Sequence, residues 1–114
     1  MQTYQGQCHC GAVRFEVDLD LSHTLQCNCS FCRRKGAVIA FANVEALRVT
    51  AGEDQLKLYQ FGNKDAQHRF CRTCGIHPFH KPILLHDKVG INVGCLDGVD
   101  PFTTSHQLFQ GIEL

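Results

Sequence analysis

The feature that most constrains this chain is the grouping of its eight cysteines. Three short motifs hold all of them except Cys95: Cys8-His9-Cys10, Cys27-Asn28-Cys29-Ser30-Phe31-Cys32 and Cys71-Arg72-Thr73-Cys74. The first residues have neither a basic start nor an apolar stretch, so we expect no secretory signal peptide and a cytoplasmic location. Persistent disulfides are rare in that reducing compartment, and clustered thiols there are typical of metal ligands.

The first and third motifs predict one closed metal site. Structural zinc bound only by thiolates takes four sulfurs, and soft thiolate ligands select zinc or an iron–sulfur cluster over harder cations. Cys71 and Cys74 form a two-sulfur turn, and the Gly75 that follows can adopt a positive φ and close it. The CxC motif is the other unit of two cysteines, so we expect Cys8 and Cys10 to complete the site. The spacings do not match ferredoxin patterns, which disfavours an iron–sulfur cluster; the other alternative is four buried or disulfide-bonded thiols.

The middle motif predicts a second site with different chemistry. Cys27, Cys29 and Cys32 are so close in sequence that they can hold one ion without help. Three protein ligands leave one tetrahedral position for water or substrate, which is the arrangement of catalytic zinc sites. Cys95 leaves an alternative open, because as a fourth ligand it would close this site; a histidine would do the same. Cys95 can instead be a small buried hydrophobic residue on a strand.

Charged and imidazole side chains near the motifs are candidates for supporting roles. Arg33, Arg34 and Lys35 directly follow the middle motif. They would compensate the net negative charge of a zinc ion with three thiolates, or form a solvated basic turn. His77 and His80 closely follow the CxxC motif, and either can act as a proton shuttle or be an ordinary loop residue.

Length and composition predict a single globular domain spanning residues 1–114. Hydrophobic residues make up 44% of the chain and charged residues 19%, which argues against wholesale disorder. Lys+Arg and Asp+Glu number 11 each, so the formal net charge is zero, whereas proteins that bind nucleic acid usually carry a basic excess. The longest apolar run, residues 37–42, is far shorter than the roughly 20 residues that a membrane span needs. We therefore expect neither nucleic acid nor membrane as a partner.

The hydrophobic pattern predicts short strands and no helix of convincing length. Residues 12–17 alternate, which places Val13, Phe15 and Val17 on one face of a half-buried strand. Further strands are predicted at residues 37–41, 45–50, 55–61, 66–70 and 89–93, with turns at 51–54 and 62–65. Short strands with frequent turns favour an all-β fold, a small antiparallel β domain.

Three segments together resemble the glutathione-dependent formaldehyde-activating enzyme family, which includes centromere protein V. The segments are Gln7–Phe15, Cys27–Arg33 and His68–Gly75. The order and spacing of their cysteine motifs carry the resemblance, which extends roughly from Gly6 to Pro101. It implies a β-tent fold like that of Rab-exchange-factor-like zinc proteins. It also implies two zinc ions per chain, a structural one at Cys8, Cys10, Cys71 and Cys74 and a catalytic one at Cys27, Cys29 and Cys32.

The activity that the resemblance implies is the addition of glutathione to formaldehyde, which gives S-hydroxymethylglutathione. Our leading hypothesis is therefore a zinc-dependent carbon–sulfur lyase that acts on a small thiol adduct, with glutathione as the candidate thiol partner. The main alternative is a non-enzymatic, zinc-stapled interaction module in which both ions are structural. Two further alternatives are a zinc module that binds nucleic acid or chromatin, and a thiol-redox protein that uses Cys71 and Cys74.

Overall fold

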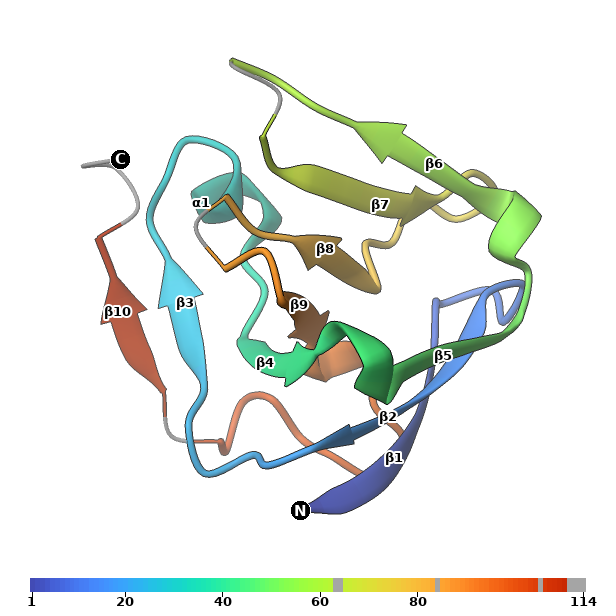
Figure 1. Cartoon of the computed structure of the whole chain (residues 1–114), viewed down its shortest axis with the longest axis horizontal. Helices are drawn as coiled ribbons and strands as arrows, with labels where there is room; N and C mark the ends of the chain where they lie inside the picture. The colour runs from blue at the N-terminus through green and yellow to red at the C-terminus, as the bar shows by residue number, and fades with distance from the viewer. Residues whose placement is uncertain (63–64, 84, 105, 111–114) are drawn as a thin grey trace.

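The chain folds into two β-sheets (Figure 1). A computed structural model describes residues 1–62, 65–83, 85–104 and 106–110. The smaller sheet has the strand order β1 (Gln2–Gln7), β2 (Arg14–Leu19) and β5 (Leu47–Ala51). The larger sheet has the order β10 (Gln107–Phe109), β3 (Leu25–Cys27), β4 (Ile39–Asn43), β9 (Lys88–Asn92), β8 (Phe79–Lys81), β7 (Gln67–Cys71) and β6 (Leu56–Tyr59).

Helical structure in the described residues is limited to single turns. One turn of α-helix, α1, spans Cys32–Lys35, and short 3₁₀ turns lie at Val44–Ala46, Glu53–Gln55 and Val93–Cys95. None of these helices is long and apolar enough to cross a membrane.

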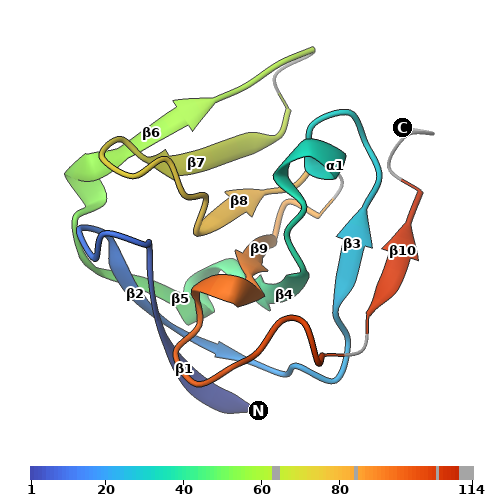
Figure 2. The ribbon, with the colours of Figure 1, turned by 180° about the vertical axis from the view of Figure 1, so that it is seen from behind.

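The all-β prediction is confirmed, and the six predicted strands overlap β2, β4, β5, β6, β7 and β9. The strands pair antiparallel, as expected, except at one edge, where β10 pairs with β3 in parallel (Figures 1 and 2). The strands β1, β3, β8 and β10 were not predicted as separate elements. The predicted turn at residues 62–65 lies partly outside the described residues.

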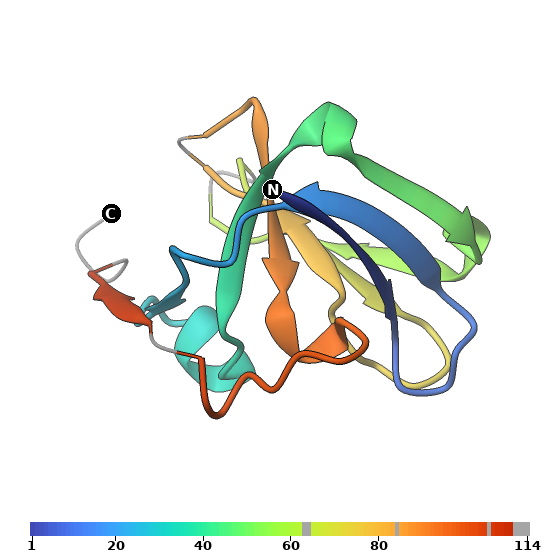
Figure 3. The same ribbon diagram turned by 90° about the horizontal axis from the view of Figure 1, so that it is seen from below.

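The principal core lies between the smaller sheet and the middle of the larger one (Figure 3). The pattern of β2 alternates as expected: Phe15 and Val17 are fully buried, and so is Val13 just before the strand. Phe15 meets Phe79 of the larger sheet edge to face, with ring centroids 5.6 Å apart. The core face of the larger sheet also includes Ala40, Ala42, Val89 and Ile91.

The other face of the larger sheet carries a row of side chains from four strands. Phe41 of β4 lies opposite Gly90 of β9, which lies opposite His80 of β8, which in turn lies opposite His68 of β7. Because successive side chains of a strand point to opposite faces, this row faces away from the principal core. The register of the sheet therefore brings two histidines and an aromatic ring together.

Candidate metal centres and an adjoining cavity

The four cysteines of the first and third motifs meet where the two sheets approach each other. Cys8 and Cys10 follow β1, whereas Cys71 ends β7 and Cys74 lies in the turn after it. Their four sulfurs all lie within 4.8 Å of one another, and Cys10 Sγ is 3.7 Å from both Cys8 Sγ and Cys71 Sγ. In a zinc tetrahedron with Zn–S bonds of about 2.3 Å, the sulfurs are about 3.8 Å apart. The donor set therefore fits a tetrahedral thiolate site.

Backbone amides support these sulfurs. The N–H of Val13 donates to Cys8 Sγ at 3.3 Å, and the N–H of Thr73 donates to Cys71 Sγ at 3.4 Å. Gly75 has a φ of 78°, as expected, and its N–H closes the turn on the carbonyl oxygen of Cys71. Such donors stabilise a negative charge on sulfur, which is the state that a metal ion binds.

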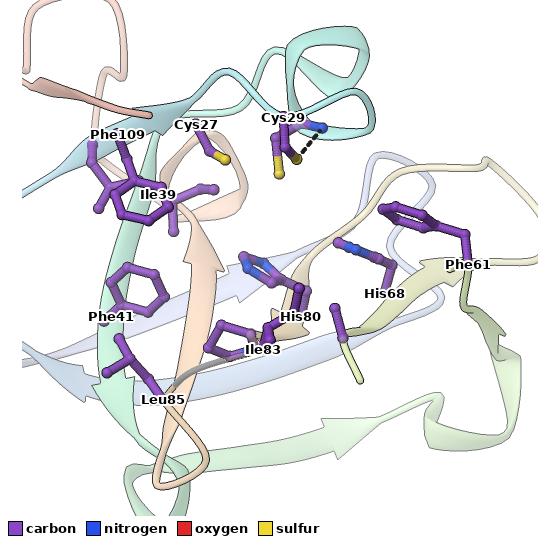
Figure 4. Close-up of a pocket in the computed structure, with 14 residues that line it drawn as sticks. Cys27, Cys29, Ile39, Phe41, Phe61, His68, His80, Ile83, Leu85 and Phe109 are labelled. Atoms are coloured by element: carbon purple, nitrogen blue, oxygen red, sulfur yellow. Dashed lines mark hydrogen bonds between the residues drawn. The ribbon is translucent and has the colours of Figure 1, made fainter. Parts of the chain in front are cut away.

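The middle motif forms a second sulfur cluster, which is local in sequence. Cys27 ends β3, Cys29 lies in the following loop and Cys32 begins α1. Their three sulfurs lie within 4.8 Å of one another, and the N–H of Cys32 donates to Cys29 Sγ at 3.3 Å (Figure 4). Burial raises the pKa of Cys29, but hydrogen bonds, the Cys32 N–H foremost, outweigh it and leave the pKa below that of an ordinary thiol. This three-thiol cluster fits a metal site with three sulfur ligands.

Cys95 is separate from the three-thiol cluster. Its side chain packs in the principal core, and burial raises its pKa to about 12. Within the described part of the chain, neither its sulfur nor a histidine nitrogen joins the group of three sulfurs. This geometry matches the buried-hydrophobe alternative, although Cys95 ends a 3₁₀ turn rather than lying on a strand, and it gives no support to Cys95 as a fourth ligand.

Of the three basic residues after the middle motif, Lys35 is the one whose charge interacts with the three thiols. Arg33 and Arg34 are exposed, and Arg34 donates to the carbonyl oxygen of Ser30 at 2.6 Å. Lys35 is partly buried, with its Nζ 5.8 Å from the centroid of the Phe31 ring. Burial lowers the pKa of Lys35, while charge on the three thiols acts in the opposite direction. The candidate for charge compensation is therefore Lys35.

A cavity of about 330 Å³ lies beside the three-thiol cluster. Figure 4 shows Cys27 and Cys29 on one side of it, with the rings of His68 and His80 on the other. Both imidazoles are buried, with 3% and 6% of their surface exposed. Burial, then the charge of Lys35, lowers the pKa of His68 to about 4 and that of His80 to about 3, so both are neutral at pH 7.

Gly90 makes room for the His80 ring. A Cβ atom at residue 90 would lie 2.3 Å from a ring carbon of His80, closer than non-bonded atoms approach. The two residues are direct partners across β8 and β9, so a side chain on Gly90 would displace the imidazole from the cavity wall.

Ring contacts made by Phe31 pack the three-thiol cluster against the β6–β7 hairpin. Phe31, which directly precedes α1, has its ring centroid 3.9 Å from that of His68 and 5.6 Å from that of Tyr59. His77 also packs against Phe31 in a T-shaped arrangement, with the two ring centroids 5.4 Å apart. His77 thus supports the ring stack, whereas His80 lines the cavity. His68 was not singled out from the sequence, because only the pairing of β7 with β8 places it beside His80.

A comparison of the sequence with known families identifies one that spans nearly the whole chain. The family model described as glutathione-dependent formaldehyde-activating enzyme matches residues 3–111. The chain belongs to this family. The resemblance carried by the three cysteine motifs is thereby confirmed.

Two curated relatives with the same family description match this chain over part of their length. Proteins from Phaeosphaeria nodorum and Pyrenophora teres f. teres, both with the provisional name glutathione-dependent formaldehyde-activating enzyme, are 33% and 32% identical over 91 residues. Each match covers 75% of this chain and 47% of the relative, so the chain spans about half the length of these proteins.

A solved structure has the same fold over almost its whole length. The crystal structure of a Rhodobacter sphaeroides protein shares 44% sequence identity with this chain, with a TM-score of 0.88. The match covers 92% of this chain and 99% of that one. The arrangement of the strands therefore recurs in a protein of known structure.

Proposed function

We propose that this protein is a zinc-dependent enzyme that forms and cleaves the carbon–sulfur bond between a small thiol and an aldehyde. The reaction site is the three-thiol cluster of Cys27, Cys29 and Cys32. The observation that carries the proposal is that these sulfurs, with no fourth ligand among the described residues, border a cavity. The family description supports the reaction class and points to glutathione and formaldehyde as the named substrates. Thiol substrates persist in a reducing compartment, so we place the protein in the cytoplasm.

The reaction is an addition that needs no external oxidant or reductant. The thiol sulfur bonds to the carbonyl carbon, the C=O π electrons move to oxygen, and the thiol proton ends on that oxygen. Cleavage reverses each step. A zinc ion held by three thiolates supplies an open coordination position and a positive charge, which favour the deprotonated form of a thiol.

Three side chains near the thiols, Lys35, His68 and His80, would stabilise the charges that develop during this addition. Lys35 places a positive charge near the thiols, which offsets the negative charge that accumulates with each added sulfur. The neutral imidazoles of His68 and His80 each have one nitrogen that donates and one that accepts. At the cavity wall, the neutral His80 can therefore donate a hydrogen bond to the carbonyl oxygen as negative charge develops there, while the thiol proton reaches that oxygen through water.

The four-thiol cluster has a structural role in this proposal. Cys8, Cys10, Cys71 and Cys74 use all four tetrahedral positions, which leaves none for a substrate. A zinc ion there would join the β1–β2 loop to the end of β7.

An exchange experiment tests the proposed reaction. The zinc-loaded protein is added to glutathione and ¹³C-formaldehyde at equilibrium, and NMR measures the exchange rate between free aldehyde and adduct. We expect the wild-type protein to accelerate exchange and Cys29→Ser to lose at least about 100-fold of the acceleration. Ser30→Ala, an exposed side chain in the same loop, is the matched control. Exchange at the uncatalysed rate with zinc-loaded wild-type protein, both for glutathione and when benzyl mercaptan replaces it, contradicts the proposal and favours the interaction module.

A further inference from the structure

The cavity beside the three-thiol cluster is almost entirely apolar. Its described lining consists of Leu25, Ile39, Phe41, Phe61, Ala66, Pro82, Ile83, Leu85 and Phe109, together with the three thiols, His68 and His80. The lining therefore includes no carboxylate, amide, arginine or lysine side chain among the described residues. Among the described residues, the polar side chains of the lining are the three thiols and two imidazoles that are neutral at pH 7.

The strands explain why this space is both open and apolar. β3 pairs with β4 only at Leu25 and Ile39, so the two strands diverge before Cys27. The cavity is bordered by Ile39 and Phe41 of β4, which point away from the principal core. Phe109 of β10 and the side chains of Ile83 and Leu85 add further apolar walls (Figure 4).

This lining is a poor match for a highly charged thiol. Glutathione carries two carboxylates and an ammonium group, and burying a charge without a partner is unfavourable. Lys35, whose charge acts on the three thiols, is not part of the described lining. By contrast, an apolar group that enters the cavity loses only its contact with water, which favours binding.

The position of the three sulfurs in the cavity wall determines which part of a bound thiol contacts the apolar lining. Cys27, Cys29 and Cys32 are themselves part of the cavity wall. A thiol bound beside them therefore places the carbon group next to its sulfur inside the cavity. The cavity volume of about 330 Å³ is near the lower end of the range for small-molecule sites, about 300–1,000 Å³.

We infer that the preferred thiol substrate of this site carries a compact alkyl or single-ring aryl group next to its sulfur. The inference rests on the proposed function, since it concerns the substituent of the thiol that reacts there. This substrate preference differs from that of a site that binds a charged tripeptide.

Calorimetric titration of the zinc-loaded protein tests the inference without measuring catalysis. Benzyl mercaptan is compared with 2-mercaptoethanol, because the two thiols ionise in a similar range and differ mainly in the substituent, and glutathione is the third ligand. We expect benzyl mercaptan to bind at least about tenfold more tightly than either hydrophilic thiol, given the apolar surface that it buries. Toluene, which lacks the sulfur, measures the contribution of the cavity alone.

Two neighbouring residues of β10 provide a matched pair of variants. Phe109 lines the cavity, whereas Leu108 is 60% exposed and lies outside the lining. Phe109→Asp introduces a charge into the wall and should weaken benzyl mercaptan about tenfold or more. Leu108→Asp should keep the wild-type affinity for all ligands.

The outcomes separate the inference from the proposed function. Equal or tighter binding of glutathione relative to benzyl mercaptan overturns the inference and leaves the proposed function standing. Equal loss of benzyl mercaptan affinity in Leu108→Asp and Phe109→Asp also overturns it. If no thiol binds at millimolar concentration, the proposed function fails and the inference fails with it.

Discussion

At the scale of single residues, the chemistry of the cavity depends on two histidines that remain neutral. His68 and His80 stack with their ring centroids 5.4 Å apart, and Gly90 leaves the space for the second ring. His68 Nδ1 is buried without a hydrogen-bond partner among the described residues. A buried imidazole nitrogen without a hydrogen-bond partner destabilises the fold. Such an unpaired nitrogen is typical of a side chain that binds a ligand.

Neutral histidines give the protein a defined response to acid. Their pKa values, about 4 for His68 and about 3 for His80, lie below the ordinary value. As pH falls below about 6.5, the unfolded chain binds protons that the folded chain excludes, so the free energy of unfolding decreases towards pH 4. We expect ¹⁵N NMR of the zinc-loaded protein to show both imidazoles neutral at pH 5.5. Protonated spectra for both rings at that pH would contradict the assignment.

The basic residues show what sequence can and cannot resolve at this scale. The run Arg33-Arg34-Lys35 directly follows the second cluster, and the sequence does not distinguish its members. The single turn α1 directs Lys35 towards buried surroundings and leaves Arg33 and Arg34 exposed. The distinction depends on the turn and on the Phe31 ring next to Lys35.

At the scale of elements, the two clusters differ in what they connect. The four-thiol cluster joins the loop between β1 and β2 to the end of β7, and thus one sheet to the other. The three-thiol cluster lies within one short segment that includes the end of β3 and the start of α1. A metal ion contributes most to folding where it links distant segments.

Removing one sulfur from the four-thiol cluster should therefore unfold the protein. Structural zinc in small modules contributes about 10 kcal/mol or more of apparent binding free energy. We expect Cys71→Ser to be unfolded or aggregated, as measured by circular dichroism and zinc content. Cys95→Ala, a buried cysteine outside both clusters, is the control and should keep the wild-type zinc content. A Cys71→Ser variant with native stability would show that the cluster does not determine folding.

The strands were predictable where their side chains form an apolar pattern; the six-residue β1 was missed because its sequence, QTYQGQ, has no such pattern. The alternation around Phe15 and Val17 identified β2, and the apolar run at residues 37–41 identified most of β4. By contrast, β3, β8 and β10 have three residues each, which is too few for a periodicity of two to be recognised. The parallel pairing of β10 with β3 joins segments about 80 residues apart, and no local signal specifies it.

At the scale of the whole molecule, the grouping of the sulfurs into two clusters was predictable and the cavity was not. Cysteine spacing alone separated four sulfurs from three, because short motifs hold their members close together whatever the fold. The cavity depends on the register across β4, β9, β8 and β7, which places Phe41, Gly90, His80 and His68 in one row. Register between distant strands is a property of the folded chain, so the apolar lining emerges only from the structure.

The account depends centrally on the three-thiol cluster being an open metal site that binds a thiol through sulfur. The direct measurement is zinc content together with calorimetric titration of 2-mercaptoethanol across a pH series, on wild-type protein and on Cys29→Ser. The account predicts two zinc ions per wild-type chain and an affinity for the thiol that rises with pH until the free thiol's own pKa is passed. Cys29→Ser should stay folded, hold one zinc ion and bind no thiol. A folded Cys29→Ser variant that binds the thiol as wild type does, or a wild-type protein with two zinc ions and no thiol binding, would contradict the account.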